Sequence, residues 1–520
     1  ALVIWAGYGF HVTAVPGLPF KVPAGTHLRI FQSLQEHYDL GHPTFALGKL
    51  SEHGWWWYFP LAFVLKTPLP VLILILWAFS RFTFHGRSQT SKVISLTPAS
   101  IALWLFPLLY TFSSLFSTVN IGYRHLLPIL PFLYIGIGQM AHSELRITNY
   151  ELRITNHISR FTFYVLLFWL LAGTLITLPY PLTFFNELAG GARNGYRYLV
   201  DSNLDWGQNL WDLKAWMQEH GEDHVYYAHY SPAWPQTYNI NADFLPPDPR
   251  AVSFAPWNPA PGLYAIGATV LQGPYAPDLN TYAWFRSREP DARLGNALFV
   301  YHVPARSAPT WTVLCTSVSV ETLKVNLGED DDIRILQPDC AQAHVYPNES
   351  TPGVYVTEAG AEPPPGAHLD VALRDTEGAS TTAVYRIETS PAPQSSIEAV
   401  SLNGPLTFIG YTQHGTDQLW TYWRVMDIPG RPLSLMAHLI GPDGTAVAVG
   451  DGLGFPIEQW QVGDLIIQHH DLTPPAEATP GTYSIHTGAY WLDTMERWAI
   501  TIEDQTYDHI DLLTVEIPNR

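Results

Sequence analysis

The chain has 520 residues and a net charge of −19, from 27 Lys and Arg against 46 Asp and Glu. So acidic a chain excludes nucleic acid as a partner, because binding nucleic acid needs basic surface to replace counterions. The charge is unevenly distributed. The first 182 residues hold 11 Lys and Arg against 5 Asp and Glu, whereas the remaining 338 hold 16 against 41. Two parts of different character are therefore expected.

The amino-terminal part contains five apolar stretches, at residues 1–14, 59–80, 95–116, 121–140 and 161–182. Each complete stretch approaches the ~20 apolar residues that a helix needs to cross a hydrocarbon core. We therefore expect a polytopic α-helical membrane domain over residues 1–182, with one span per stretch. The first stretch is short and begins at Ala1 with no charged segment before it, so we expect the sequence to start within a longer span.

Positive charge gathers between the second and third stretches and between the fourth and fifth. The residues concerned are Arg81, Arg87, Lys92, Arg146, Arg153 and Arg160. Because cytoplasmic loops carry an excess of Lys and Arg, both loops are expected in the cytoplasm. Alternation of the spans then predicts a multi-pass protein of the cell membrane whose residues 183–520 are extracytoplasmic.

Three regions are expected after residue 182. Residues 183–303 indicate an α/β domain, with a helix over 210–217 that ends near Gly221 and strands at 225–230, 262–267 and 297–302. Residues 304–395 are rich in Pro, Thr and Ala and are expected to be linker with some strands. Residues 396–520 predict an all-β sandwich. Its expected strands are 406–411, 418–425, 433–440, 446–449, 465–472, 481–490 and 498–501.

Cysteine and histidine usage predicts no metal site. Cys315 and Cys340 lie in the part expected outside, where a disulfide could persist. Two cysteines alone leave a disulfide and two buried free thiols as open alternatives. The histidines lack the spacing of a ligand set. Those considered are His42, His53, His125, His220 and His224. We therefore expect neither a metal nor a cofactor.

Two cations lie where apolar stretches meet the side expected outside. Lys66 is several residues into the second stretch, where a charge costs a few kcal/mol. It is expected either to extend outward beside the proline at 68 or to meet an anion. Arg124 lies near the start of the fourth stretch, and its planar fork of donors suits a phosphate better than an ammonium would. The alternative for Arg124 is an interfacial anchor.

Six short motifs follow one another between residues 5 and 207. They are Trp-Ala-Gly-Tyr-Gly-Phe at 5–10, Gly-Trp-Trp-Trp-Tyr-Phe-Pro at 54–60, Leu-Lys-Thr-Pro-Leu at 65–69, Gly-Tyr-Arg-His-Leu-Leu-Pro at 122–128, Phe-Phe-Asn-Glu at 184–187 and Asp-Ser-Asn-Leu-Asp-Trp-Gly at 201–207. In this order they resemble bacterial glycosyltransferases of the family 39 type, relatives of the dolichyl-phosphate-mannose protein mannosyltransferases with the GT-C membrane architecture. The resemblance extends over residues 1–303.

The resemblance implies a polyprenyl-phosphate-sugar-dependent glycosyltransferase, which works at the lipid bilayer and transfers a sugar to a glycan, lipid or protein acceptor outside the cell. We expect the substrate-binding residues to be Arg124, Lys66, His42 and Tyr123. The acidic catalytic base of the family has no counterpart here and is expected upstream of Ala1, so the fragment is expected to bind the carrier without acting alone. The alternative is a non-catalytic, membrane-anchored surface protein whose β-sandwich binds a ligand.

Overall fold

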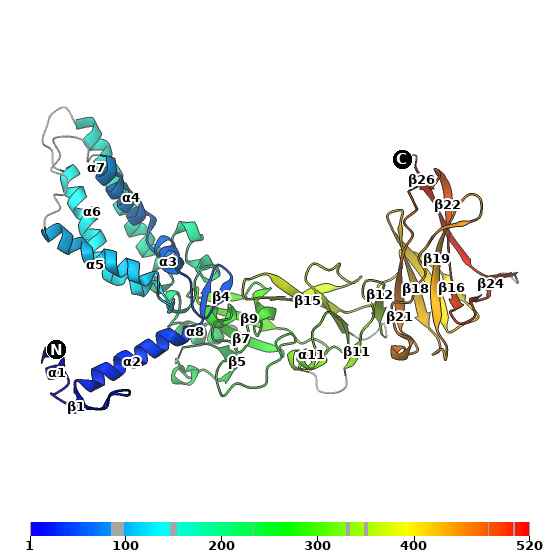
Figure 1. Ribbon diagram of the computed structural model, residues 1–520, viewed down its shortest axis with the longest axis horizontal. Helices are drawn as coiled ribbons and strands as arrows, with labels where there is room; N and C mark the ends of the chain where they lie inside the picture. The colour runs from blue at the N-terminus through cyan, green and yellow to red at the C-terminus, as the bar shows by residue number, and fades with distance from the viewer. Residues whose placement is uncertain are drawn as a thin grey trace. The chain divides into compact units, whose positions relative to one another are not determined.

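The computed structural model describes residues 2–84, 98–145, 153–231, 233–328, 333–347, 352–476, 478–502 and 505–518. The chain divides into two compact units. Unit 1 comprises Ala1–Phe254, Ala260–Pro304 and Arg374–Ala379, and unit 2 comprises Ala255–Pro259, Ala305–Leu373 and Ser380–Arg520. Figure 1 labels the helices and strands of both units.

Unit 1 begins with helices and short hairpins. In chain order they are α1 (Leu2–Gly7), β1 (Val12–Thr13), β2 (Val22–Pro23), α2 (Gly25–Leu40), β3 (Thr44–Ala46), β4 (Lys49–Ser51), α3 (Tyr58–Lys66), α4 (Leu69–Phe84), α5 (Pro98–Ser114), the 3-10 helix η1 (Tyr123–Ile129), α6 (Leu130–Leu145) and α7 (Arg153–Thr177). Helix α4 packs on α6 and α7, and α5 packs on α6 (Figure 1). Many of their apolar side chains are exposed, such as Leu108 at 67% and Phe168 at 72%.

The chain is a mixed α and β protein, and the expected architecture with a polytopic α-helical membrane domain is wrong. In the described part of the chain, no one helix combines the length and apolar composition that crossing a membrane requires. Helix α3 and the first part of α4, Leu69–Trp77, meet this requirement only as a pair, across a bend of 109°. The loop residues Arg87, Lys92 and Arg146 lie outside the described residues, so the expected orientation stays a prediction.

Proline explains where the expected spans break. Pro68 lacks an N–H and clashes with the preceding turn, so α3 stops at Lys66 and Thr67 is extended at φ −87° and ψ 132°. Pro128 lies within η1, which replaces the start of the fourth expected span by a tighter 3-10 helix before α6 begins. The second and fourth apolar stretches are therefore divided into shorter helical pieces than their composition suggests.

A five-stranded sheet follows the helices in unit 1, in the order β6-β5-β7-β9-β8. Its strands are β5 (Val225–Ala228), β6 (Ala242–Phe244), β7 (Gly262–Gly267), β8 (Ala292–Leu294) and β9 (Leu298–Val303). Helix α8 (Leu210–His220) packs Leu213 and Met217 against Leu263 of this sheet, and it ends at Gly221, whose φ of 73° suits glycine. The expected helix over 210–217 and the three expected strands are confirmed, with small differences at their ends.

Short helices connect the elements of unit 1. They are η3 (Pro181–Thr183), η4 (Glu187–Ala189), η5 (Ala192–Arg197), η6 (Asp201–Asn203), η7 (Pro235–Tyr238), α9 (Ala268–Leu271) and α10 (Ala283–Arg286). Of these, η6 and the loop after α9 supply the polar side chains of the candidate site. Residues Arg374–Ala379 belong to the same unit, and Arg374 donates a 2.7 Å hydrogen bond to the Gln272 carbonyl.

Unit 2 opens with a sheet in the order β11-β10-β13-β15-β14. Its strands are β10 (Trp311–Cys315), β11 (Arg334–Leu336), β13 (Gly353–Glu358), β14 (His368–Arg374) and β15 (Ser380–Ile387), and helix α11 (Val320–Leu327) connects β10 to β11. Strands β10 and β13 are parallel, which requires a crossover between them. Much of the stretch 304–395, for which we expected a linker with some strands, is therefore folded into this sheet.

The rest of unit 2 contains two further five-stranded sheets, both antiparallel, in the orders β12-β21-β18-β17-β16 and β20-β19-β22-β23 with β26 added to β22. The strands are β12 (Ala343–Tyr346), β16 (Ser395–Ser401), β17 (Leu406–His414), β18 (Gln418–Val425), β19 (Leu433–Ile440), β20 (Ala446–Val449), β21 (Leu465–Asp471), β22 (Gly481–Trp491), β23 (Glu496–Arg497) and β26 (Ile510–Ile517), with a hairpin of β24 (Ile500–Ile502) and β25 (Gln505–Tyr507) and the 3-10 helix η8 (Ile457–Gln459). Phe408 and Trp423 of the first sheet share a buried core with Leu435 and Ala489 of the second. The two sheets therefore pack face to face.

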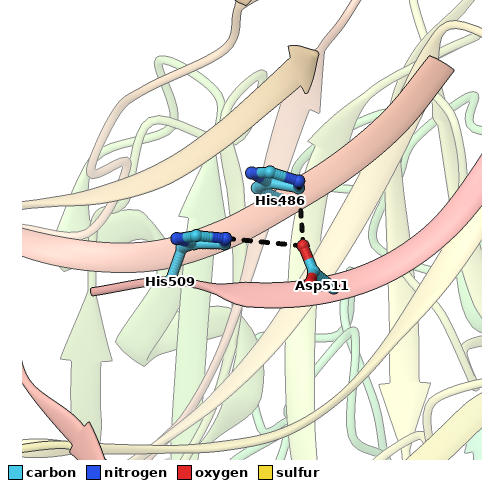
Figure 2. Close-up of side chains that lie close together, drawn as sticks. All are labelled: His486, His509 and Asp511. Atoms are coloured by element: carbon cyan, nitrogen blue, oxygen red, sulfur yellow. Dashed lines mark ion pairs between the residues drawn. The ribbon is translucent and has the colours of Figure 1, made fainter. Parts of the chain in front are cut away.

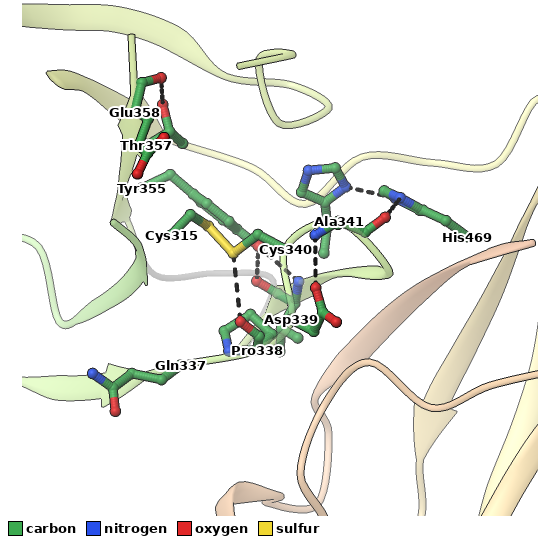
Figure 3. The surroundings of a disulfide bond; sticks show 12 residues. Cys315, Gln337, Pro338, Asp339, Cys340, Ala341, Tyr355, Thr357, Glu358 and His469 are labelled. Carbon is green, nitrogen blue, oxygen red and sulfur yellow. Dashed lines mark hydrogen bonds between the residues drawn. A yellow bond between two sulfur atoms is a disulfide. The ribbon is translucent and has the colours of Figure 1, made fainter. Parts of the chain in front are cut away.

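Cys315 and Cys340 form a disulfide, which resolves the two alternatives left open by the sequence. Figure 3 shows Cys315 at the end of β10 joined to Cys340, which precedes β12. Their Cα atoms are 5.7 Å apart, within the usual range for a disulfide. The bond therefore links the first sheet of unit 2 to the segment that leads into the next sheet.

Replacing both cysteines, as Cys315→Ser with Cys340→Ser, should lower the free energy of unfolding of unit 2 by about 3 kcal/mol. The reason is that a cross-link between residues 25 apart restricts the unfolded chain. Denaturant unfolding followed by tryptophan fluorescence measures the change. Wild-type protein treated with a reductant should lose the same stability, and equal stability with and without reductant would contradict the role of the bond.

Candidate functional site

The carboxyl end of α3 is buried, and Asn186 satisfies its backbone. The Asn186 side chain donates to the carbonyls of Val64 and Thr67 at 2.6 and 2.8 Å, and its backbone N–H donates to Leu65 at 2.9 Å. The last carbonyls of any helix lack partners within the helix, and a buried carbonyl without a partner is costly. Asn186 therefore allows α3 to end inside the unit.

Lys66, the last residue of α3, is also held by backbone carbonyls. Its Nζ donates to Leu182 at 2.8 Å and to Asn203, and it lies 4.7 Å from the centre of the Phe185 ring. The side chain is only 8% exposed, and this burial lowers the pKa of Lys66 to about 7. A neutral amine has two N–H donors, and two carbonyls accept here. Lys66 is thus placed as an internal tether, away from any anion that solvent could deliver.

Asn203 connects the start of α3 to the turn that carries Tyr123. Its Nδ2 donates to the Tyr58 hydroxyl at 2.9 Å, and its Oδ1 accepts from the Tyr123 N–H at 2.9 Å. The Tyr123 hydroxyl lies 3.0 Å from Thr67 Oγ1, and burial raises the pKa of Tyr123 to about 12. Tyr123 is therefore a neutral, fixed side chain that sets the position of the residue after it.

Gly122 brings the same turn close to η6. A Cβ atom built on Gly122 would lie 3.0 Å from Ser202 Cβ, so a larger residue would push the turn away. The contact places the two motifs at 122–128 and 201–207 side by side, although 80 residues separate Tyr123 from Asn203. Lys66, Asn186 and Asn203, which we call the buried polar cluster, hold this arrangement.

Arg124 projects from this turn into solvent. The residue is exposed, and its guanidinium lies 5.0 Å from the centre of the Trp206 ring. No carboxylate among the described residues pairs with it. The neighbouring His125 has a buried Nε2 atom that finds no hydrogen-bond partner in the described part of the chain. Arg124 and His125 thus offer donors that the fold itself does not use.

Asp201 is a buried carboxylate next to this turn. Its oxygens accept from the Tyr275 hydroxyl and from Ser202 Oγ, the latter at 2.7 Å. The backbone of Asp201 has a φ of 62°, a conformation that few residues other than Gly, Asn and Asp adopt. His42 Nε2 lies 3.2 Å from the same Tyr275 hydroxyl. His42 and Asp201 therefore share one tyrosine.

Tyr230 and Tyr275 form a stacked pair beside Asp201, with ring centres 5.2 Å apart and planes 9° apart. Burial, and next the negative charge of Asp201, raise the pKa of both hydroxyls well above the usual range. Both tyrosines therefore stay neutral and act as hydrogen-bond donors. We call Asp201, His42, Arg124, Tyr230 and Tyr275 the Asp201 site.

A buried hydrogen-bonded pair, Asp205 and His229, lies next to Tyr230 of the site. His229 Nε2 donates to the Asp205 carboxylate, while His229 Nδ1 accepts from the Ser231 N–H at 2.8 Å. The Gly207 N–H donates to the other Asp205 oxygen at 2.8 Å. The Tyr230 hydroxyl donates to the Asp205 backbone carbonyl, so this pair fixes one of the two stacked tyrosines.

The structure brings some of the expected substrate-binding residues together and not others. Arg124, His42 and Tyr123 lie in or next to the Asp201 site, whereas Lys66 lies in the buried polar cluster. Asp201 was not among the expected site residues, although Asp201 is the first residue of the motif at 201–207. Tyr275 was not among them either, and the sequence carries no local signal for it, since it lies in a loop some 70 residues later.

The chain finds no match when it is compared with protein-family models, with curated proteins and with solved structures. The resemblance of the motifs to a glycosyltransferase family therefore stays a prediction. What the chain can bind has to be inferred from the charges and donors of the Asp201 site.

The state of Lys66 predicts a pH dependence of stability. Lys66 has a pKa of about 7 in the folded chain and 10.5 as its ordinary value, so the unfolded chain binds more protons between these limits. The free energy of unfolding should therefore rise as the pH increases from 7 to 10. Unfolding at several pH values should show this slope for wild type and for Lys21→Met, a variant of an exposed lysine. Lys66→Met should lack it, and an unchanged slope in that variant would show that Lys66 stays charged.

Proposed function

We propose that the Asp201 site binds a sugar carried on a polyprenyl phosphate, as the donor for a glycosyl transfer. The observation that carries this proposal is Arg124, an exposed guanidinium without a carboxylate partner among the described residues, next to a buried carboxylate with tyrosine hydroxyls. Such a site can accept an anionic group and a hydroxylated group side by side. A sugar phosphate presents both.

Arg124 suits the phosphate. A guanidinium presents a planar fork of N–H groups that matches two phosphate oxygens, and its stacking on Trp206 holds the fork in place. His125 adds an unpartnered Nε2 beside it, and burial, followed by the charge of Arg124, lowers the pKa of this imidazole. The positive charge of the site is therefore concentrated on Arg124.

The other side of the site suits a sugar. Asp201 accepts hydrogen bonds, the hydroxyl oxygens of Tyr230 and Tyr275 can accept further ones because their hydrogens are donated within the protein, and the ring of Trp206 is 48% exposed. Sugar hydroxyls both donate and accept, and an exposed aromatic ring provides a face for the C–H groups of a sugar. These side chains therefore provide polar and apolar contacts of the kinds a single sugar residue requires.

The surface beyond Arg124 suits the hydrocarbon of the carrier. Leu127 of η1 is 52% exposed, and helix α5, which the Tyr110 hydroxyl joins to the His125 carbonyl at 2.8 Å, exposes Leu108, Leu109 and Phe112. Contiguous exposed apolar side chains favour an apolar partner. A ligand with a phosphate head and a prenyl tail would cover Arg124 and this surface together.

The disulfide supports a location outside the cytoplasm for unit 2, because disulfides persist in oxidising compartments. We propose that unit 2 is extracytoplasmic and that the acceptor, a glycan, lipid or protein, is met on that side.

Arg124→Ala should weaken the binding of a short-chain polyprenyl phosphate by about 10- to 100-fold, the effect of losing a charge-assisted hydrogen bond. Binding to the purified chain in detergent micelles can be followed through the fluorescence of Trp206 and its neighbours or by calorimetry. Arg197→Ala is the matched control, because Arg197 is also exposed and lies over a ring, 5.6 Å from the centre of Tyr196. Equal affinity of Arg124→Ala and wild type would reject the proposal.

The variant Asp201→Asn should distinguish the contribution of the sugar to binding from that of the phosphate. Asparagine tolerates the left-handed backbone of Asp201, so the variant should fold. We expect about tenfold weaker binding of a glycosylated polyprenyl phosphate and unchanged binding of the phosphate without sugar. Asp212→Asn is the control, since Asp212 also accepts from a tyrosine hydroxyl, that of Tyr180 at 2.9 Å. Equal loss for both ligands would mean that Asp201 only shapes the site.

A further inference from the structure

Three potential metal ligands meet on neighbouring strands of unit 2, far in sequence from the Asp201 site. His486 of β22 pairs in register with Asp511 of β26, and His509 directly precedes β26 (Figure 2). The two strands are antiparallel neighbours, so paired residues present their side chains on the same face of the sheet. Strand pairing next to a register shift between Ile485 and His486 therefore fixes the separation of the first two ligands.

The distances between the three side chains suit one ion. His486 Nε2 lies 2.8 Å and His509 Nε2 3.5 Å from the same oxygen of Asp511, and one ligand atom from each residue lies within 4.8 Å of the others. Two ligands on a tetrahedral ion with bonds of 2.0–2.1 Å are about 3.4 Å apart. The two measured separations lie on either side of this value, so an ion can enter with small side-chain movements.

His509 is oriented by a second carboxylate. Its Nδ1 donates to Asp508 at 2.7 Å, which leaves Nε2 as the atom that faces Asp511. Asp508 is held in turn by Arg497 at 2.9 Å. A carboxylate that accepts from the far nitrogen of a ligating histidine is the usual support of a protein metal site, because it fixes the tautomer and the direction of the ring.

Further groups lie close to His486. The rings of His486 and His509 stack 4.3 Å apart, and His438 lies opposite His486 on β19. His438 has its own partner, Asp451, at 3.1 Å, and Ser484 Oγ lies 3.1 Å from His486 Nε2, so these groups surround the triad without completing it.

An ion pair alone explains the geometry less well. The two imidazoles lie next to the same oxygen of Asp511. The side chain of Asp511 is 76% exposed, and an exposed ion pair contributes little to the free energy of unfolding. In the described residues no other set of three His, Cys, Asp or Glu side chains converges in this way. Two histidines and a carboxylate with solvent on the open side form a donor set for zinc or a similar transition metal.

We propose that His486, His509 and Asp511 bind one transition-metal dication, with Zn²⁺ as the first choice, and leave at least one coordination position open to water or another oxygen ligand. Asp508 acts as a positioning residue that fixes the ring of His509. The proposal is independent of the sugar-phosphate site, since all four residues belong to unit 2. Binding would also join β22 to the segment before β26.

Titration of the purified full chain with Co²⁺ tests the proposal, because tetrahedral Co²⁺ absorbs visible light and Zn²⁺ displaces it. Wild type should take up one equivalent with a visible band that Zn²⁺ removes. His486→Ala with His509→Ala should abolish the band, and Asp508→Asn should weaken binding about 10- to 100-fold. His368→Ala, a change of an exposed histidine of the same unit, should bind like wild type.

Two results would overturn the proposal. The first is the absence of saturable binding by wild type, and the second is equal binding by wild type and the double variant. Thermal unfolding in a chelator separates loss of a ligand from loss of the fold, because the double variant and chelated wild type should then unfold at similar temperatures. Asp511→Asn provides a further check, since it removes the carboxylate while keeping the shape of the side chain and should also lose the band.

Discussion

Unit 1 depends on the need to satisfy backbone carbonyls where α3 ends inside the protein. Pro68 ends the helix, and each buried carbonyl left without a donor would cost about 1–3 kcal/mol. Asn186 of the buried polar cluster supplies those donors, while Lys66 donates to the Leu182 and Asn203 carbonyls and Asn203 donates to Val200, so that three segments distant in sequence are joined. These segments are thereby held at one place, and the proposed site is a consequence of that constraint.

The same constraint gives two cations different surroundings: one is bound within the fold and the other is exposed to solvent. Lys66 and Arg124 look alike in the sequence, as single cations at the ends of apolar stretches. Burial and two carbonyl acceptors bind Lys66 into the fold, whereas Asn203, by accepting from the N–H of Tyr123, fixes the turn from which Arg124 reaches solvent. The Asp201 carboxylate is then the nearby negative group, and its charge is shared with Tyr275 and Ser202. The exposed cation and the hydrogen-bonded carboxylate thus lie on different side chains of the proposed site.

Unit 2 is stabilised in a different way. Its core is apolar and is shared by two sheets, with Phe408 and Trp423 packed against Leu435, and a disulfide joins the preceding sheet to the segment before β12. Such a core leaves polar side chains at the sheet surface free to take other roles. The triad of His486, His509 and Asp511 lies on that surface, where strand pairing rather than burial determines its geometry.

The sequence by itself determined the local elements. Strand alternation predicts 418–425, 433–440 and 446–449 with the bounds that β18, β19 and β20 have, and helical spacing with a terminal glycine predicts α8. The same reasoning failed for the apolar stretches, because apolar composition does not show where a proline ends a helix or how a bend divides it. It also grouped Arg124 with Lys66, although Lys66 is buried and held by carbonyls whereas Arg124 is exposed.

Only the tertiary structure decided which polar residues meet. Tyr275 reaches Asp201 across 74 residues, and His486 reaches Asp511 through strand pairing, neither of which leaves a pattern at short range. The physical reason is that hydrophobic periodicity acts within one helix or strand, whereas hydrogen bonds and ion ligands join side chains from elements that packing brings together.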